Sequence, residues 1–203
     1  MEIKKGELLF RINGRDILYD SNCSFDENCR YVLNLSLAVN HNNRNKIMFI
    51  LKNPSTATHK QKDIDNTLKR LVGWTYRKNI HNFTVCNVYA FKAKTPQELK
   101  NISQEERIGK ENNNQIKKSL MEHEEIILGL GEHKPLPKKD YDCRIYEILQ
   151  FEEIKNKKLF KIGECTKEGY PKHPRWWSYK IDKTEIPTFD IQMVLSRLNN
   201  QCN

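Results

Sequence analysis

The sequence predicts an α/β protein, a three-layer α/β/α sandwich with a central four-stranded parallel sheet. Strand-like and helix-like segments alternate four times along the chain. The first strand-like segment, 46–52, is almost continuously apolar, as expected of a strand that is buried on both faces. Parallel strands need long crossover connections, usually helices, so this alternation favours a parallel sheet covered by helices on both faces.

The expected elements follow one another in a regular order. The predicted strands occupy 46–52, 82–91, 124–131 and 157–163, and the predicted helices occupy 63–79, 95–101, 103–122, 142–151 and 188–200. Asp65 is available to cap the first helix, and Ser103 with Glu106 forms a capping-box pattern. Residues 1–45 hold short strand-like runs separated by turn formers, which predicts a β-rich N-terminal extension on a single α/β domain of residues 46–203.

The composition favours a polyanionic partner. The chain has 203 residues and a formal net charge of +9, which points to nucleic acid or a nucleotide. Surface lysines that only keep the protein in solution are the alternative. The six cysteines include no C-x-x-C pair, so we expect reduced thiols in a cytoplasmic protein rather than a disulfide framework or a zinc site. No apolar run reaches about 18 residues and no signal-peptide pattern is present, so no membrane partner is expected.

Several common chemistries have no motif in this chain. It contains no Walker loop, no G-x-G-x-x-G after a strand, no G-x-S-x-G, no H-E-x-x-H and no zinc-ligand spacing. A dinucleotide oxidoreductase, a P-loop NTPase and a zinc hydrolase are therefore disfavoured, and neither a metal nor a cofactor is expected.

Ligands of open parallel sheets bind beyond the carboxyl ends of the strands, so the residues after each predicted strand are the candidates for a site. They are Asn53, Ser55, Thr56, Asp65 and Thr67 after the first strand, Asn87, Phe91 and Lys92 at the end of the second, His133 after the third, and Thr166, Lys167, Lys172, His173, Arg175 and Trp176 after the fourth. Any one of these loops is explained by ordinary turn residues. Four polar loops at one sheet edge favour a shared site. The remaining histidines, His41, His59, His81 and His123, are expected at the surface.

These loops carry a resemblance to a bacterial and phage family known as domain of unknown function 1643. The segments "LKNPSTATHKQKDIDNTLKRLVGW", "NVYAFKAKTPQELK", "GLGEH" and "IGECTKEGYPKHP" resemble its successive motifs over roughly residues 48–175. The motifs run L-N-P-S-T-A, D-x-T-x-x-R, N-x-F-A-x-R-x-T-x-P, G-x-H and L-G-x-T-x-x-G-x-P-x-H-P. Asn66 stands where the family usually has proline, and Lys92 stands where it usually has arginine. Membership of this family implies no activity.

A second resemblance, to another family, implies an activity. Uracil-DNA glycosylases are α/β/α sandwiches with a four-stranded parallel sheet, a G-x-[N/D]-P loop after the first strand and an H-P-S loop after the fourth. Asn53-Pro54-Ser55 and His173-Pro174-Arg175 are similar to those two loops. The resemblance implies that Asn53 positions a water molecule and that His173 donates a hydrogen bond to the carbonyl of the base. Because an amide is a poor base, any rate gain would come mostly from orientation and leaving-group stabilisation.

The remaining candidates have supporting roles in this hypothesis. Asn87 would read the edge of the base with its paired donor and acceptor, and Phe91 or Tyr89 would stack on the base. Asp65 either caps its helix only or also activates the water. The other base- or nucleotide-binding candidates are Ser55, Thr56, Thr67, Lys92, His133, Thr166 and Lys167.

The segment 172–180 alternates basic and aromatic residues, which suits phosphates and exposed bases. Lys172, Arg175 and Trp176 are the predicted nucleic-acid contacts; alternatively, the tryptophans of this segment only anchor it to the core. The sequence thus predicts an N-glycosylase-type hydrolase acting on a base, modified or not, in nucleic acid or in a nucleotide. The competing hypothesis is a non-catalytic protein that holds a nucleotide, a signalling molecule or a modified base in the same pocket.

Overall fold

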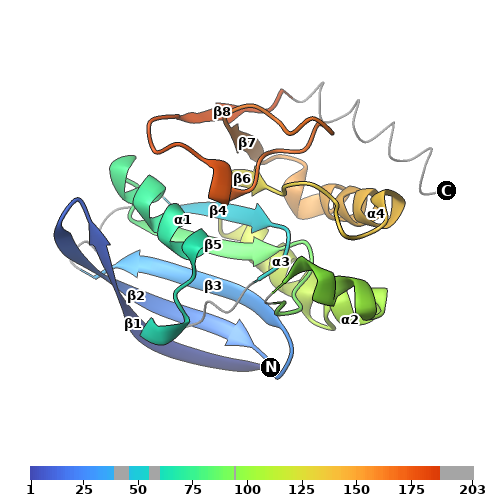
Figure 1. The fold of residues 1–203 in the computed structure, drawn as a ribbon, viewed down its shortest axis with the longest axis horizontal. Coiled ribbons are helices and arrows are strands. Elements are labelled where there is room, and N and C mark those ends of the chain that lie inside the picture. The colour runs from blue at the N-terminus through green and yellow to red at the C-terminus, as the bar shows by residue number, and fades with distance from the viewer. Residues whose placement is uncertain (39–45, 55–59, 94, 188–203) are drawn as a thin grey trace.

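A computed structural model of the chain describes residues 1–38, 46–54, 60–93 and 95–187, and within them one mixed sheet runs through the whole molecule (Figure 1). Its strand order is β1-β2-β3-β5-β4-β6-β7-β8. The strands are β1 (Glu2–Ile12), β2 (Arg15–Phe25), β3 (Arg30–Leu37), β4 (Lys46–Leu51), β5 (Asn82–Asn87), β6 (Glu125–Gly129), β7 (Lys158–Ile162) and β8 (Lys183–Glu185).

The α/β class expected from the sequence is confirmed. The four predicted strands correspond to β4, β5, β6 and β7, and β4 pairs in parallel with both β5 and β6, while β6 pairs in parallel with β7. The expected sheet of four strands is too small. β3 joins β5 in antiparallel pairing, so β1, β2 and β3 continue the sheet at one edge, and β8 pairs with β7 at the other. β8 is only three residues long, and its sequence shows no pattern typical of a strand.

The described helices are α1 (Asn66–Arg77), α2 (Gln104–Ile108), α3 (Asn112–Met121) and α4 (Lys138–Leu149), with short 3-10 turns η1 (Gln61–Asp63), η2 (Pro96–Asn101), η3 (Glu152–Ile154) and η4 (Pro174–Trp176). Asp65 caps α1 as predicted, because its Oδ1 accepts the backbone N–H of Leu68 at 2.7 Å. The capping box of Ser103 and Glu106 is also present. The predicted helix 103–122 is interrupted, since α2 ends at Gly109 with a φ of 82°. The predicted helix 188–200 lies outside the described residues.

Side chains of β4 alternate between two cores, one on each face of the sheet. Ile47, Phe49 and Leu51 belong to the core beneath α1. Met48 and Ile50 belong to the other core, which α3 and α4 cover. Strand β4 is thus buried on both faces, as its continuous apolar run predicts.

Three expectations about single residues are wrong. His81 and His123 are buried, with 9% and 4% of their surface exposed. His123 lies within hydrogen-bonding distance of Thr84 Oγ1 and Ser119 O, at 3.1 and 2.7 Å, which explains why an imidazole is tolerated there. The expectation of reduced thiols holds for Cys23, Cys29, Cys86 and Cys165, which are free, but it is wrong for Cys143, which is disulfide-bonded.

Gly109 is required both for its backbone and for the space around it. A Cβ at this position would lie 2.9 Å from Cys29 Sγ and 3.1 Å from Tyr31 Cε1. Gly14 has a similar φ of 78° but has no atom within 4 Å of its Cβ position.

We expect Gly14→Ala to cost about 1–2 kcal/mol of the free energy of unfolding, for backbone strain alone. Gly109→Ala should cost about 1–3 kcal/mol more, because the neighbouring core must move. Urea unfolding of both variants tests this, and equal losses would show that crowding is unimportant.

Candidate functional site

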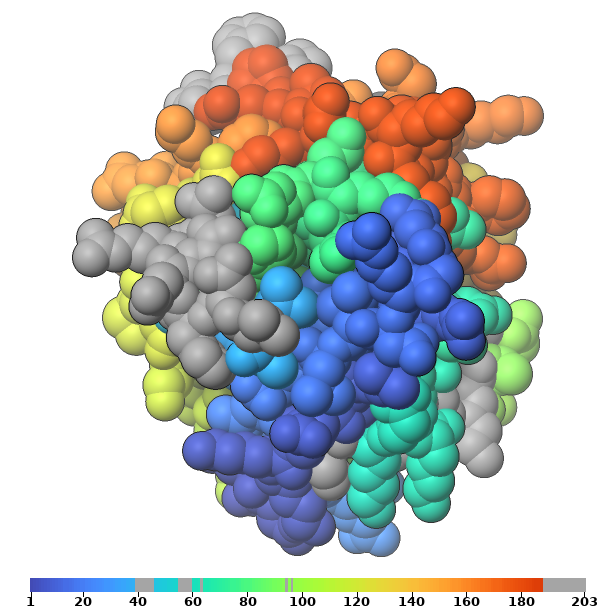
Figure 2. All heavy atoms as spheres, turned by 90° about the vertical axis from the view of Figure 1, so that its left-hand side faces the viewer, coloured from blue at the N-terminus to red at the C-terminus, as the bar shows by residue number. Residues whose placement is uncertain are grey.

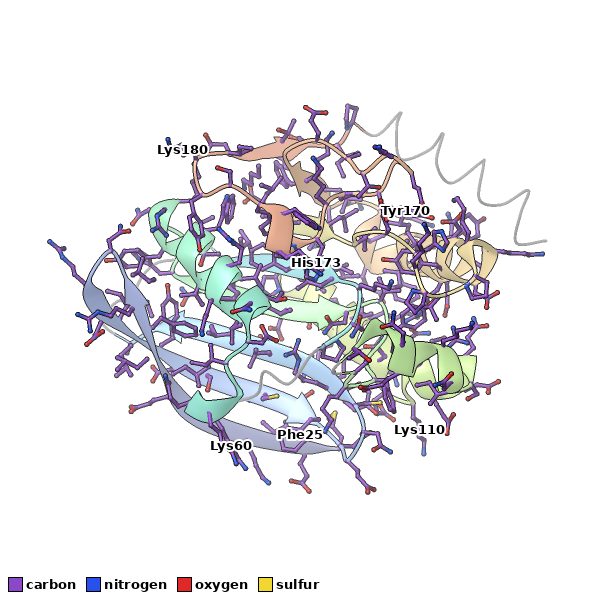
Figure 3. All side chains as sticks on the ribbon, viewed as in Figure 1. Phe25, Lys60, Lys110, Tyr170, His173 and Lys180 are labelled. Atoms are coloured by element: carbon purple, nitrogen blue, oxygen red, sulfur yellow. The ribbon has the colours of Figure 1, made fainter. Side chains whose placement is uncertain are left out.

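The carboxyl ends of the three central parallel strands lie level with one another. Leu51, the last residue of β4, is paired with Asn87 of β5 on one side and with Gly129 of β6 on the other. The loops after these strands therefore leave the sheet from one edge. His173, from the loop after β7, lies on the same side, toward which the arrowheads of β4 and β5 point (Figures 1 and 3).

A small cavity lies between this edge and the start of α1. Its polar lining is formed by Arg30, Asn53, Asp65 and Thr67, and its apolar lining is formed by Leu33, Leu51, Leu68, Leu71 and Val85. The cavity measures about 20 Å³, which is enough for about one water molecule and too little for a nucleobase. Three of the predicted site residues, Asn53, Asp65 and Thr67, thus surround one water-sized space. Ser55 and Thr56 lie outside the described residues.

Local hydrogen bonds leave one oxygen of Asn53 and one of Asp65 available. Asn53 donates its amide N–H to Pro54 O at 3.0 Å, and within the described residues its Oδ1 has no partner. Asp65 uses Oδ1 to accept the N–H of Leu68, and no described group donates to its Oδ2. Two oxygen acceptors beside a water-sized cavity are suited to holding and orienting a water molecule.

His173 is packed against the loop after β6. A Cβ on Gly131 would lie 3.1 Å from His173 Cβ, so the glycine permits this close approach. The Nδ1 atom of His173 accepts the backbone N–H of Arg175 at 3.3 Å, which leaves the proton of the neutral ring on Nε2. Burial, with a further contribution from Arg175, lowers the pKa of His173 to about 4, while Asp65 opposes this shift. His173 is therefore a neutral Nε2–H donor near pH 7. The next residue, Pro174, packs against Gly129 beside the cavity-lining Leu51, since a Cβ on Gly129 would lie 3.2 Å from Pro174 Cδ and 2.7 Å from Leu51 Cδ2.

Lys52 ties the loop after β4 to the loop after β6. Its ammonium donates to the carbonyl oxygens of Glu132, His133 and Lys134, at 2.9, 3.0 and 2.5 Å. Burial lowers the pKa of Lys52 to about 8, partly offset by Glu132. The sequence interpretation missed this residue. The available signal was a lysine directly after the apolar run 47–51, where its charge has to be compensated by nearby polar groups.

Arg30 is a second residue that the sequence interpretation missed. It lies at the start of β3, is only 4% exposed and lines the cavity with Asp65. Burial lowers the pKa of Arg30, and the negative charge of Asp65 opposes this shift. The sequence gives no indication that an arginine at the start of a strand-like run lies near the site. Arg30 reaches the cavity only because β3 pairs in antiparallel orientation with β5.

Asn87 has an unusual environment for a buried amide. It is 0% exposed, and neither Oδ1 nor Nδ2 has a hydrogen-bond partner in the described structure. Alternation along β5 places it on the same face as Val85, which lines the cavity, and it is level with Leu51. An unpaired buried amide costs about 1–3 kcal/mol, so this side chain is explained best by a partner that completes its hydrogen bonds.

The loops after β6 and β7 also contact each other. His133 Nε2 lies 3.3 Å from Glu168 Oε2, and its Nδ1 lies 2.7 Å from Leu136 O. Thr166 accepts the N–H of Tyr170 at 3.2 Å and thereby closes a tight turn, whereas Lys167 is exposed. His133 and Thr166 hold loop structure in place, and no contact links them or Lys167 to the cavity within the described residues.

Three residues that were expected at the site after β5, two of them aromatic, contact other parts of the fold instead. Phe91 forms a β-bridge with Cys29 and packs against the core on the α3 side. Lys92 donates to the carbonyl oxygens of Asp26 and Glu27, at 3.1 and 2.6 Å. Tyr89 is wholly buried and stacks on Tyr141 with ring centroids 6.2 Å apart. The structure therefore does not bring these three residues to the cavity.

The two tryptophans of the last loop have opposite environments. Trp177 is 3% exposed, packs against Phe49 and Trp74, and donates its indole N–H to Lys172 O at 2.7 Å. Trp176 is 69% exposed, and the guanidinium of Arg175 lies 5.1 Å from its ring. Anchoring explains Trp177, while Trp176 and Arg175 remain at the surface and accessible to a partner.

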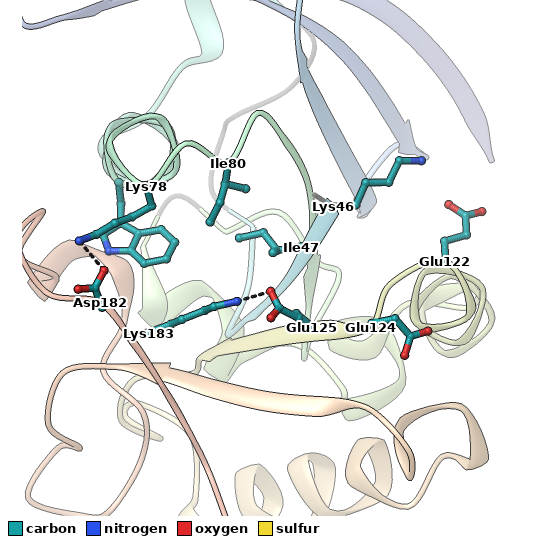
Figure 4. Close-up of a pocket in the computed structure, with 10 residues that line it drawn as sticks. Lys46, Ile47, Lys78, Ile80, Glu122, Glu124, Glu125, Asp182 and Lys183 are labelled. Atoms are coloured by element: carbon teal, nitrogen blue, oxygen red, sulfur yellow. Dashed lines mark hydrogen bonds and ion pairs between the residues drawn. The ribbon is translucent and has the colours of Figure 1, made fainter. Parts of the chain in front are cut away.

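A much larger cavity, of about 590 Å³, lies at the opposite edge of the sheet, where β4 and β6 begin (Figure 4). Its lining includes Lys46, Glu122 and Glu124. Lys78 pairs with Asp182 at 2.7 Å, and Lys183 pairs with Glu125, so opposite charges of the wall already compensate one another. This edge carries the amino ends of the parallel strands, where ligands of such sheets rarely bind.

The described residues contain no group of three or more histidines, cysteines or carboxylates arranged to hold a metal ion. None of the described helices combines the length and the apolar character needed to span a bilayer.

The unpaired amide of Asn87 gives a test on the free protein. We expect Asn87→Leu to raise the free energy of unfolding by about 1–3 kcal/mol, because it removes a buried group that lacks hydrogen bonds. Asn112 is the matched control, since it is equally buried but donates to Asn87 O and Val88 O at 3.1 and 3.2 Å. Asn112→Leu should destabilise the protein. Urea denaturation measures both, and a destabilised Asn87→Leu variant would contradict the assignment.

The lowered pKa of His173 predicts a pH dependence of stability. The ring takes up a proton below about 6.5 when unfolded and only below about 4 when folded, so the unfolded state binds more protons between these values. Stability should therefore fall as the pH drops through this window, by up to about 3 kcal/mol. His173→Gln should lose less stability between pH 7 and pH 4.5 than the wild type, as measured by urea unfolding. Parallel pH curves for the two proteins would argue against a partly buried imidazole that stays neutral in the folded state.

Comparisons with known proteins identify the chain at the level of its family only. No curated protein and no solved structure matches it. The family model described as "Protein of unknown function (DUF1643)" matches residues 30–175, which include Arg30 and every described residue discussed around the cavity. The chain therefore belongs to the DUF1643 family.

Proposed function

We propose that the protein binds a nucleobase at the carboxyl ends of its parallel strands and hydrolyses the N-glycosidic bond of that base. The observation that carries the proposal is Asn87, a fully buried amide with an unpaired donor and an unpaired acceptor. Nucleobase edges present donors and acceptors side by side, so a single amide can satisfy such an edge with two hydrogen bonds. The base, modified or not, would belong to nucleic acid or to a nucleotide.

The groups around the cavity support a hydrolytic step. Asn53 Oδ1 and Asp65 Oδ2 would hold a water molecule, and the carboxylate of Asp65 would take its proton as the water oxygen bonds to the sugar carbon. The bond between this carbon and the base nitrogen would break, and its electrons would leave with the base. The Nε2–H of His173 would donate a hydrogen bond to the departing base and stabilise its negative charge. Thr67 and Arg30 complete the polar lining.

A glycosylase-like fold is part of the proposal. Its support is the parallel block β5-β4-β6-β7 with helices on both faces, together with the proximity of two loops: Asn53 and Leu51 line the cavity, and Pro174 packs with Leu51 against Gly129. A likeness of fold does not by itself fix an activity, so the activity rests on the site residues.

A non-catalytic binder is the second candidate. The cavity holds no more than about one water molecule, and Asp65 already serves as the cap of α1. A protein that only retains a nucleotide or a modified base would need Asn87 but no base that activates water.

The test is release of free base from a panel of oligonucleotides and nucleotides carrying unmodified and modified bases. We expect release from one member of the panel, with the rate reduced about 100- to 1,000-fold in Asn53→Ala and His173→Ala, because each removes a group that acts in the transition state. His173→Gln keeps an N–H donor and should restore part of the rate.

Asn114→Ala is the control for these variants, since Asn114 is exposed on α3, on the other face of the sheet. It should leave the rate unchanged. Absence of release together with retention of one nucleotide, lost in Asn87→Leu, would establish the binder instead. Release that is unaffected by Asn53→Ala and His173→Ala would place the chemistry elsewhere.

A further inference from the structure

A groove of about 600 Å³ runs between the edge strand β1 and helix α1. It is lined by Leu9, Phe10, Arg11, Ile12, Asn13, Gln61, Lys62, Ile64, Lys69, Gly73, Arg77 and Tyr179. Figure 2 shows this side of the molecule, where the tip of the β1–β2 hairpin (blue), helix α1 (green) and the segment after β7 (orange to red) come together.

The charges of the groove have one sign. Arg11, Lys62, Lys69 and Arg77 line it, and none of its described lining residues carries a carboxylate. Within the described part of the chain, none of these four cations forms a salt bridge. A concave surface lined by cations that form no ion pair raises the local concentration of anions.

The ring of Tyr179 holds two arginines of helix α1, Arg70 and Arg77, in place beside the groove. The ring of Tyr179 packs on Gly73, where an added Cβ would lie 2.9 Å from the ring. The guanidinium groups of Arg70 and Arg77 lie 4.5 and 4.2 Å from the centroid of this ring. Arg77 also donates to Gly73 O at 2.7 Å and to Asn13 Oδ1 at 2.6 Å, which holds it between α1 and the hairpin. Ordered guanidinium groups are suited to phosphate contacts, because less side-chain freedom is lost on binding.

The floor of the groove is fixed as well. Gln61 accepts the backbone N–H of Leu9 at 2.7 Å and donates to Leu9 O at 2.9 Å, so the segment before α1 is attached to strand β1. This segment also joins the groove to the candidate site, because Ile64 lines the groove and Asp65 lines the water-sized cavity. The groove and the cavity therefore border the same short segment of the chain.

We propose that this groove binds the sugar–phosphate backbone of a single strand of nucleic acid and guides it to the candidate site. The inference rests on the proposed function and names its substrate class as a polynucleotide rather than a free nucleotide. Lys69 and Arg77 both line the groove and are about 12 Å apart along the axis of α1, and Arg11 of β1 and Lys62 of η1 line the same groove. Charges spread over this length match successive phosphates of a strand better than the phosphates of one nucleotide.

The test is the salt dependence of binding to a fluorescent single-stranded oligonucleotide of 20 nucleotides, measured by anisotropy in the Asn53→Ala background so that the strand stays intact. For single strands each phosphate contact contributes about 0.7 to the slope of log affinity against log salt. The double variant Lys62→Gln/Lys69→Gln should therefore reduce the slope by about 1.4. Lys118→Gln/Lys139→Gln, an equal loss of charge at exposed sites on α3 and α4, should leave it unchanged.

A second probe separates this inference from the proposed function. An oligonucleotide with abasic sites throughout presents phosphates but no base, so it should keep the wild-type slope and respond to Lys62→Gln/Lys69→Gln in the same way. Asn87→Leu should not change its binding. If groove and control variants reduce the slope equally, or if polyglutamate of equal charge competes as well as the oligonucleotide, the groove assignment is overturned. Base release and nucleotide retention would still test the site itself, because a mononucleotide needs no groove.

Discussion

The central position of β4 determines where every candidate residue lies. It pairs in parallel with β5 and with β6, so the last residues of these three strands stand level at one edge. Its side chains are buried on both faces, which requires a helix layer on each side. Because α1 follows β4 on one face, the N-terminus of α1 returns to the same edge and brings Asp65 beside Asn53. An antiparallel β4 would place both residues at the edge of the sheet opposite to Asn87.

The polar groups at this edge differ in how their burial is compensated. Lys52 is satisfied by three carbonyl oxygens of the loop after β6, and it thereby gives that loop a defined shape. Asn112 likewise satisfies the carbonyl oxygens of Asn87 and Val88. The side chain of Asn87 has no such compensation among the described residues. Asn87 differs from Asn112 in degree, because within the described part of the chain Asn112 lacks a partner only at its Oδ1 whereas Asn87 lacks partners at both Oδ1 and Nδ2. A buried amide without any hydrogen bond is rare in native proteins and is a reason to look for a ligand.

The sequence predicted those features that depend on local patterns. The capping residues Asp65 and Ser103 were recognised because a cap needs only one side chain and its own helix. The four parallel strands were recognised from their apolar runs. The antiparallel connection of β3 to β5 was not, because it depends on pairing between segments about 50 residues apart that share no local signal. Arg30 and Lys52 were missed for the same reason, since their partners come from other strands and loops. Phe91, Lys92 and Tyr89 were assigned to the site because the second strand was expected to run to residue 91, whereas β5 ends at Asn87 and these three side chains contact other parts of the fold.

The three tryptophans differ in exposure, so their intrinsic fluorescence can report on two different events. Trp74 and Trp177 are 1% and 3% exposed and lie in contact within one core, so their emission follows the integrity of the fold. Trp176 is the third of the three tryptophans in the chain and stands in solvent with 69% of its surface exposed. A molecule arriving at this loop would quench or shift the emission of Trp176 alone, while the shorter-wavelength signal of the buried pair stays constant. Occupancy of the loop and unfolding of the core can thus be followed separately in one unlabelled sample.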